Sequence, residues 1–161
     1  MIRFEMVGDN QLVAMLRRMT PALQRELRLS VGNLVLRLQT AVKSGKLSGQ
    51  ALGVRTGRLR RSIDQRTAAS ANAVEGRVFT NVEYARGHEY GYRGPASVRG
   101  HLRMVKQAFG RQMKQPRAVF VRPHVKQVNL PERSFMRSAL REMQGVIEQE
   151  LAQAVERGAR Q

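Results

Sequence analysis

The sequence predicts an α+β fold in a single domain spanning residues 1–161. Apolar stripes of helical period lie near both ends of the chain, short strand-like runs lie between them, and strands do not alternate regularly with helices. We therefore expect a small antiparallel sheet packed against a long N-terminal helix and a C-terminal helix, with long flexible loops. A chain of 161 residues has room for one core of this kind.

The N-terminal part predicts a short strand and then helix. Apolar and charged residues alternate over 2–7, and Asp9 offers an N-cap for a helix over 9–19. Thr20-Pro21 interrupts the apolar stripe, and proline is well tolerated at the first position of a helix. A second helix is therefore expected over 21–43, and the two helices could form one kinked rod.

A loop and a hairpin are expected next. Residues 44–57 are rich in glycine and serine, which predicts a flexible loop. Residues 63–69 and 74–82 resemble two strands joined by a short polar turn. The pattern therefore predicts a β-hairpin directly after a cluster of arginines.

The middle of the chain is the least regular part. Glycine and proline recur over 83–116, which predicts a long exposed loop with a basic insertion over 92–117 and a brief helix at 101–109. Residues 118–128 resemble a further strand, interrupted by Pro123 and so placed at an edge or a bulge. Loops of this length are usually functional, so the insertion is the place to look for function.

The C-terminal part predicts a long helix. Pro131 and Glu132 open it, with acidic charge near its start. Apolar residues from Phe135 to Val155 recur at helical spacing, and Gly158 ends the pattern.

The charge is strongly positive and unevenly distributed. Lys and Arg number 29 against 12 Asp and Glu, a formal net charge of +17, and residues 51–130 alone hold 16 basic and 4 acidic side chains. Such an asymmetry indicates a face that meets a polyanion or an acidic protein surface. The simpler interpretation is a charge that keeps the protein soluble.

Several classes of protein are excluded by what the sequence lacks. With no cysteine there is no disulfide scaffold, thiolate metal site or cysteine nucleophile. Apolar runs are only a few residues long, so neither a membrane span nor a signal peptide is expected, and the cytoplasm is the default location.

Residues for catalysis are sparse. His88, His101 and His124 lie in separate segments, without the spacing of a metal site. Glu83 and Glu89, with His88, could supply a general base and a metal ligand, but ordinary surface contacts explain them more simply. Nucleotide-binding and hydrolase motifs are absent. We therefore expect a protein that is not an enzyme and holds no metal or cofactor.

Non-specific DNA binding is the alternative function. Basic side chains in a glycine-rich loop can neutralise phosphates without reading sequence. No zinc finger or helix-turn-helix is evident, and aromatic residues are too few to stack many bases. The side chains that could contact DNA or a protein partner are Arg58, Arg60, Arg61, Arg93, Arg99, Arg103, Lys106, Arg111 and Lys114.

Three segments together resemble a known family. Residues 56–63 (TGRLRRSI), 82–91 (VEYARGHEYG) and 130–136 (LPERSFM) resemble the motifs "TG-x-L-R-x-S-I", "Y-A-x-x-H/E-x-G" and "P-x-R-x-F-[ML]". These motifs are typical of tailed-phage tail-completion and neck proteins, in the HK97 gp10-like family and the related phage virion morphogenesis (Mu G-like) proteins. The matching residues are Thr56, Gly57, Leu59, Ile63, Tyr84, Ala85, Gly91, Pro131, Arg133 and Phe135.

The resemblance implies a structural virion protein at the phage head-tail junction. Such proteins act in tail completion, as tail terminators or in the neck, and are assembled in the host cytoplasm. The implied assembly is a homo-oligomeric ring, typically a hexamer, that joins the tail tube protein to the connector or head-closure protein around the DNA channel. Contact with genomic DNA is possible there, and no membrane is involved. The long basic insertion over 92–129 departs from many relatives, which have few residues at this place.

Physical roles for the motif residues follow from their types. Gly57 can supply an unusual backbone angle, with Leu59 and Ile63 anchoring the start of a strand. Tyr84 and Gly91 are expected to fix a tight turn. Pro131, Arg133 and Phe135 are expected to set the start of the last helix. Phe135 is expected in the core, and Arg133 beside a carboxylate of its own or a neighbouring subunit. Maintenance of the fold is the simpler interpretation of all of them.

Overall fold

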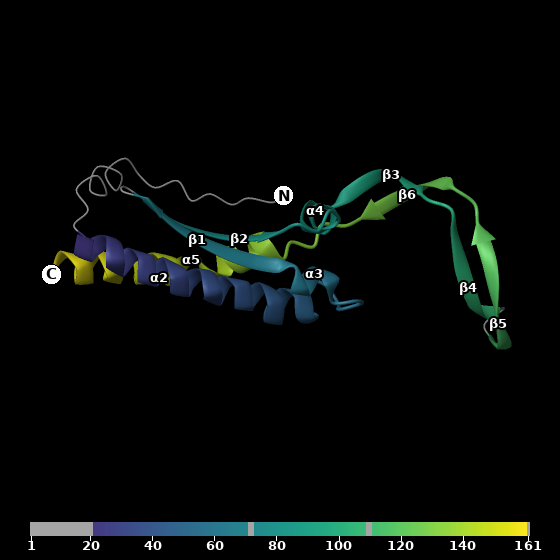
Figure 1. Cartoon of the computed structure of the whole chain (residues 1–161), viewed down its shortest axis with the longest axis horizontal. Coiled ribbons are helices and arrows are strands. Elements are labelled where there is room, and N and C mark those ends of the chain that lie inside the picture. Colours follow the sequence, from purple (N-terminus) through teal and green to yellow (C-terminus); the bar gives the residue numbers. More distant parts are fainter. Residues whose placement is uncertain (1–20, 71–72, 109–110, 161) are drawn as a thin grey trace. The chain divides into compact units, whose positions relative to one another are not determined.

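The computed structural model describes residues 21–70, 73–108 and 111–160, and it has the predicted α+β class (Figure 1). The strand expected over 2–7 and the helix over 9–19 lie outside the described residues. The chain divides into two units, which we call the scaffold (up to Tyr90 and from Glu132 onward) and the ribbon unit (Gly91–Pro131). The sequence predicted a single domain over 1–161 and gave no sign of this division into two units.

Helices and one hairpin make up the described part of the scaffold. In chain order its elements are α2 (Pro21–Thr40), the π-helical turn η1 (Ala41–Gly45), the 3-10 turn η2 (Lys46–Ser48), α3 (Arg58–Arg61), β1 (Ile63–Ser70), β2 (Ala73–Thr80), α4 (Ala85–Tyr90) and α5 (Met136–Ala159).

The two long helices, α2 and α5, run antiparallel and side by side (Figure 1). Arg157 near the end of α5 pairs with Glu26 near the start of α2. Gly158 lies so close to Leu23 that an added Cβ would be only 2.6 Å from the Leu23 Cα. The missing side chain at this position therefore allows the helices to approach each other. The predicted helix over 21–43 is confirmed, and helical turns continue it to Ser48.

The predicted hairpin is confirmed and packs on α2. Strands β1 and β2 pair antiparallel in regular register, with Ile63 opposite Thr80. The Gln39 side-chain amide on α2 donates to the Ile63 carbonyl at 3.0 Å. A Cβ added at Gly76 in β2 would overlap Val35 of α2, so only glycine allows this close contact.

The main hydrophobic core of the scaffold joins segments that are far apart in the sequence. Leu47 and Leu52 are buried in it, so residues 44–57 are not wholly the loop predicted: the first part is helical and the next is anchored by apolar contacts. The loop was predicted from the glycine and serine content of the segment, which gave no weight to the two leucines. The buried members are Val42, Leu47, Leu52, Ile63, Val82, Ala85, Phe135, Met136 and Ala139.

The ribbon unit consists of strands where a loop was predicted. Strand β3 (Tyr92–Val98) pairs with β6 (His124–Leu130), and β4 (His101–Ala108) pairs with β5 (Arg111–Val121), both antiparallel. The predictions of a basic loop over 92–117 and of a brief helix at 101–109 are therefore wrong. Charged side chains lie on both faces of these strands, as Arg103 and Lys106 do in β4. The alternation of apolar and polar residues that identifies a strand is therefore weak.

The strand expected over 118–128 is also corrected, because it is the end of one strand and the start of another. Strand β5 ends at Val121 and β6 begins at His124, in different two-stranded sheets. Pro123 lies in the break, where its lack of an N–H removes no ladder hydrogen bond.

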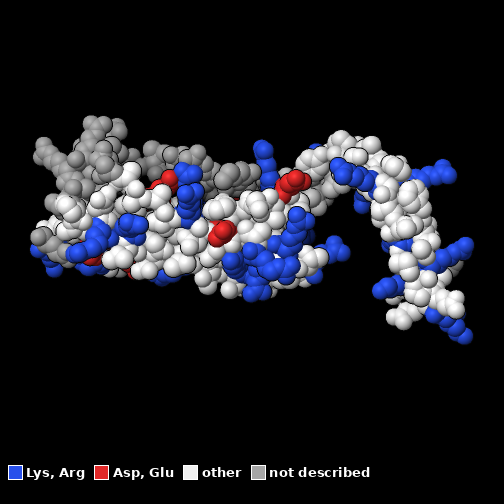
Figure 2. All heavy atoms as spheres, viewed as in Figure 1, with Lys and Arg blue, Asp and Glu red and all other residues white. Residues whose placement is uncertain are grey.

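Basic side chains mark the surface of both units on the face shown in Figure 2. Among the described helices, none is both long and apolar enough to cross a membrane.

Candidate functional site

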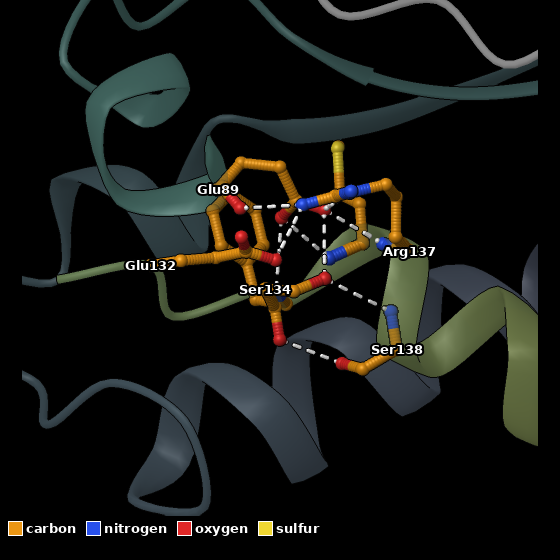
Figure 3. Close-up of polar contacts among 7 residues, drawn as sticks. Glu89, Glu132, Ser134, Arg137 and Ser138 are labelled. Carbon is orange, nitrogen blue, oxygen red and sulfur yellow. Dashed lines mark hydrogen bonds and ion pairs between the residues drawn. The ribbon is translucent and has the colours of Figure 1, made fainter. Parts of the chain in front are cut away.

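A buried carboxylate lies at the junction of α4 and α5. The Glu89 side chain on α4 has no exposed surface and accepts hydrogen bonds from the first N–H groups of α5 (Figure 3). The donors are the backbone N–H groups of Phe135, Met136 and Arg137 at 2.8, 2.9 and 2.9 Å. The first N–H groups of a helix lack partners within it, so Glu89 caps α5 from a segment more than 40 residues away.

Two opposing effects act on the pKa of Glu89. Burial alone would raise it, because a low-dielectric environment disfavours the charged carboxylate. The hydrogen bonds from the α5 backbone and the Ser134 hydroxyl outweigh burial and hold the pKa below its ordinary value. The carboxylate is therefore charged at neutral pH, where it also interacts favourably with the positive end of the α5 dipole.

Arg137 completes a polar cluster that we call the clasp: Glu89, Glu132, Ser134 and Arg137 (Figure 3). Its guanidinium donates to the Glu89 carbonyl oxygen at 3.0 Å and to the Glu132 carboxylate at 2.7 Å. It also lies over the Tyr90 ring, 4.5 Å from the ring centroid. Tyr90 and Glu132 are the scaffold residues that flank the ribbon unit in sequence, so the clasp ties together the two places where the chain leaves and re-enters the scaffold.

His88 lies beside the clasp and has a structural environment. Its backbone carbonyl accepts the Arg133 N–H at 2.8 Å, and its ring meets Tyr84 edge-on. Burial, and then the positive charge of Arg133, lower the pKa of His88. With both oxygens of Glu89 bound to α5, the imagined pairing of His88 with Glu89 as a base has no free carboxylate oxygen. No group of His, Asp and Glu suited to hold a metal ion occurs in the described residues.

The family-motif residues around α3 lie as their types suggested. Gly57 has a φ of 69°, in the left-handed region that favours glycine, directly before α3. Leu59 packs against the main core and Ile63 is buried within it. Thr56 accepts the Arg58 N–H with its hydroxyl at 3.4 Å. The "TG" motif therefore forms a turn that is anchored by apolar side chains.

The remaining motif residues divide between core and surface. Phe135 and Ala85 are fully buried in the main core, whereas Tyr84 is exposed. Gly91 has a φ of 75° at the start of the ribbon unit, and Pro131 ends that unit. Arg133 makes no ion pair with the described residues, and the nearby carboxylates of Glu89 and Glu132 pair with Arg137. A carboxylate of a neighbouring subunit stays the predicted partner of Arg133.

The candidate DNA or partner contacts fall on two separate units. Arg58, Arg60 and Arg61 lie exposed on α3 of the scaffold. The other six lie exposed in the ribbon unit: Arg93, Arg99, Arg103, Lys106, Arg111 and Lys114. The nine residues are therefore divided between two units, three on the scaffold and six on the ribbon unit.

The ribbon unit has no hydrophobic core. None of its described side chains is buried. Strand pairing places Leu102 opposite Phe120 and Met104 opposite Ala118, on one face of the β4–β5 hairpin. Leu102, Phe120 and Met104 remain 72%, 60% and 55% exposed. Two-stranded ribbons are at best marginally stable alone in water, so this face is suited to contact with another molecule.

Sequence reasoning missed the clasp. From sequence, Glu89 has the interpretation of a base or metal ligand, and no pattern distinguishes Ser134 or Arg137. No short-range spacing connects Glu89 to Arg137, because 48 residues separate them. A weak signal does exist: Ser134 directly precedes the start of the predicted apolar stripe, where caps are usually found.

Comparison with known proteins identifies no relative. No protein-family model matches the chain, and neither a curated protein nor a solved structure does.

Proposed function

We propose that this protein is a structural virion component of the phage head-tail junction, acting in tail completion, as a tail terminator or in the neck. It forms a ring, with six subunits as the expected number, that joins the tail tube protein to the connector or head-closure protein around the DNA channel. Its action is docking and oligomerisation, without catalysis. Assembly takes place in the cytoplasm of the host bacterium.

The observation that best supports an assembly role is the coreless ribbon unit on a packed scaffold. The scaffold buries an aromatic and several aliphatic side chains, whereas none of the described ribbon side chains is buried. A protein that worked alone would gain nothing from exposing the Leu102 and Phe120 pair to water, since burial of each such side chain is worth about 1.5–3 kcal/mol. Contact with a partner protein or a second subunit would supply that burial.

The motif residues add a second line of support. Gly57, Ile63 and Phe135 maintain the turn and core of the scaffold, which agrees with their being the parts of the chain that resemble the phage family. The ribbon unit is the part of the chain that differs from the family pattern, and it carries the exposed apolar face with Leu102 and Phe120.

Assembly of phage particles tests the proposal. Loss of the protein is expected to leave separate heads and tails in electron micrographs, and the purified chain is expected to form rings alone or with the tail tube or connector protein. The variant Leu102→Ser/Phe120→Ser should fail to restore joining while its scaffold remains folded by circular dichroism.

A matched control changes two exposed leucines of the scaffold, Leu29→Ser/Leu36→Ser, which lie on α2. This control is expected to restore joining. Normally joined particles in the absence of the protein would refute the proposal.

A further inference from the structure

The ribbon unit is free of acidic residues. Its 41 residues include nine Lys and Arg and no Asp or Glu, so all 12 acidic residues of the chain lie elsewhere. The nearest acidic residues on either side are Glu89 and Glu132, both in the clasp. A surface that serves solubility mixes both signs of charge, whereas exclusion of one sign favours a polyanionic partner. On the face shown in Figure 2, the charged side chains over the strands of this unit are all basic.

A bulge with a shift of register interrupts the β4–β5 hairpin. Val105 pairs with Arg117 and Gln107 pairs with Gln112, so Lys106 alone lies opposite residues 113–116 of β5. Pro116 cannot donate to the ladder and therefore fits this unpaired stretch. Bulges bend a strand and change the direction of its side chains, so this one alters the otherwise regular surface of the hairpin.

An open hollow of about 620 Å³ lies at the bulge. Two cations, Arg103 and Lys106, and two amides, Gln107 and Gln112, form its polar lining. The two amides are cross-strand partners and so lie on the same face. The hollow thus combines positive charge with groups that both donate and accept hydrogen bonds. Its apolar lining is Met104, Val105, Met113 and Pro116.

We propose that the β4–β5 hairpin is a duplex-DNA-binding arm that lies in a groove of the double helix with this bulged part. The major groove is about 12 Å wide and admits a two-stranded β-ribbon. Lys106, Arg111 and Lys114 neutralise phosphates beside the groove, and the amides of Gln107 and Gln112 contact base edges or sugars. Binding has little sequence preference, because most of the contacts are to phosphate.

DNA accounts for the bulged part of the hairpin better than an acidic protein does. The most exposed of the apolar pairs, Leu102 with Phe120, lies at the opposite end of the hairpin, beside Gly100. The bulged part instead has cations and amides at exposed positions on both strands. The two ends of one hairpin can therefore serve different partners. The DNA site takes its biological setting from the proposed assembly function, but its physical basis is the hairpin itself.

Binding of the full chain to a fluorescently labelled duplex of random sequence tests the proposal, by anisotropy at several salt concentrations. The logarithm of the binding constant is expected to fall with the logarithm of salt, by about 0.9 per phosphate neutralised. The variant Lys106→Gln/Arg111→Gln/Lys114→Gln is expected to reduce this slope by about 2–3.

A control with the same change in net charge is Arg28→Gln/Arg141→Gln/Arg160→Gln, three exposed positions on or next to the scaffold helices. It should leave the slope within about 0.5 of the original. Equal effects of the two triple variants would overturn the proposal, because overall charge and not the hairpin would then govern binding.

A single substitution checks the hollow itself. Gln112→Glu introduces an acidic group into the acid-free unit and is expected to weaken duplex binding about tenfold in low salt. Gln153→Glu makes the same chemical change at an exposed site on α5 and should have little effect. If the original chain binds no duplex in about 50 mM salt, the DNA proposal is refuted. In that case, loss of head-tail joining in the triple hairpin variant would indicate an acidic protein partner and would leave the assembly function standing.

Discussion

At the scale of single residues, Glu89 is a fully buried carboxylate held by several hydrogen bonds. Both carboxylate oxygens bind the first turn of α5, and no surface is exposed. A buried carboxylate is tolerated only when its hydrogen bonds replace those to water. Here backbone groups of α5, the Ser134 hydroxyl and Arg137 do so, which makes one acidic residue responsible for the start of the last helix.

Glu89→Gln is expected to destabilise the protein by about 2–4 kcal/mol. An amide offers one acceptor oxygen in place of two, and its NH2 group would face N–H donors. Urea unfolding followed by circular dichroism measures the loss. Glu156→Gln, at an exposed position near the end of α5, serves as the control and should change stability by less than about 0.5 kcal/mol.

The pH dependence of this difference follows from the lowered pKa of Glu89. A carboxyl whose pKa is lower in the folded state stabilises the fold above its unfolded pKa, about 4.3, and loses that contribution as pH falls through the folded value. The gap in stability between the original chain and Glu89→Gln should therefore be full at pH 7 and shrink below about pH 4.3. A gap that stays constant down to pH 2 would argue against an ionised cap.

The role of Glu89 could not be predicted from sequence. A glutamate next to a histidine in a polar segment has no feature that separates a helix cap from a catalytic base. Its partners lie beyond the whole ribbon unit in sequence, and only the folded chain brings them together. The burial of Phe135 was predictable because it begins the apolar stripe of the last helix, and the burial of Ile63 because it was expected to anchor the start of a strand.

At the scale of elements, two glycines of α5 have opposite surroundings. Gly145 has open space where a Cβ would lie, whereas Gly158 meets the Leu23 backbone. Gly145→Ala is expected to stabilise the protein by about 0.5–1 kcal/mol, the usual gain from helix propensity. Gly158→Ala is expected to destabilise it by about 1–3 kcal/mol, because α2 and α5 must separate. Thermal unfolding of both variants measures the difference, and equal effects would contradict the close approach of the two helices.

The elements themselves differ in how well sequence predicts them. Helices α2 and α5 were predictable, because one face of each is buried and the apolar residues follow the helical period. The β1–β2 hairpin, whose strands are mostly half-buried or exposed, was predictable from the short polar turn between two strand-like runs. Strand β4 was not, because neither of its faces is buried. With no core to select apolar residues, Arg103 and Lys106 follow no strand-like pattern and the segment resembles a loop.

At the scale of the whole molecule, the scaffold is expected to fold without the ribbon unit. Replacing Gly91–Pro131 with a short glycine-serine linker removes no buried side chain among those described. A shorter connection also costs less closure entropy, so the free energy of unfolding should stay equal or rise by up to about 2 kcal/mol. Urea unfolding measures this value. A clear loss of stability would show that the ribbon unit supports the scaffold.

The core of the scaffold also determines when the protein can fold during its synthesis. Phe135, Met136 and Ala139 complete that core, and they follow the 41 residues of the ribbon unit in the chain. At about 5–20 residues per second, a ribosome needs about 2–8 s to translate the ribbon unit. During that interval the apolar stripe of α2 has no α5 to cover it and Glu89 has no helix to cap. The nascent chain therefore exposes apolar surface until α5 has been translated, which makes it a candidate for binding by chaperones at the ribosome.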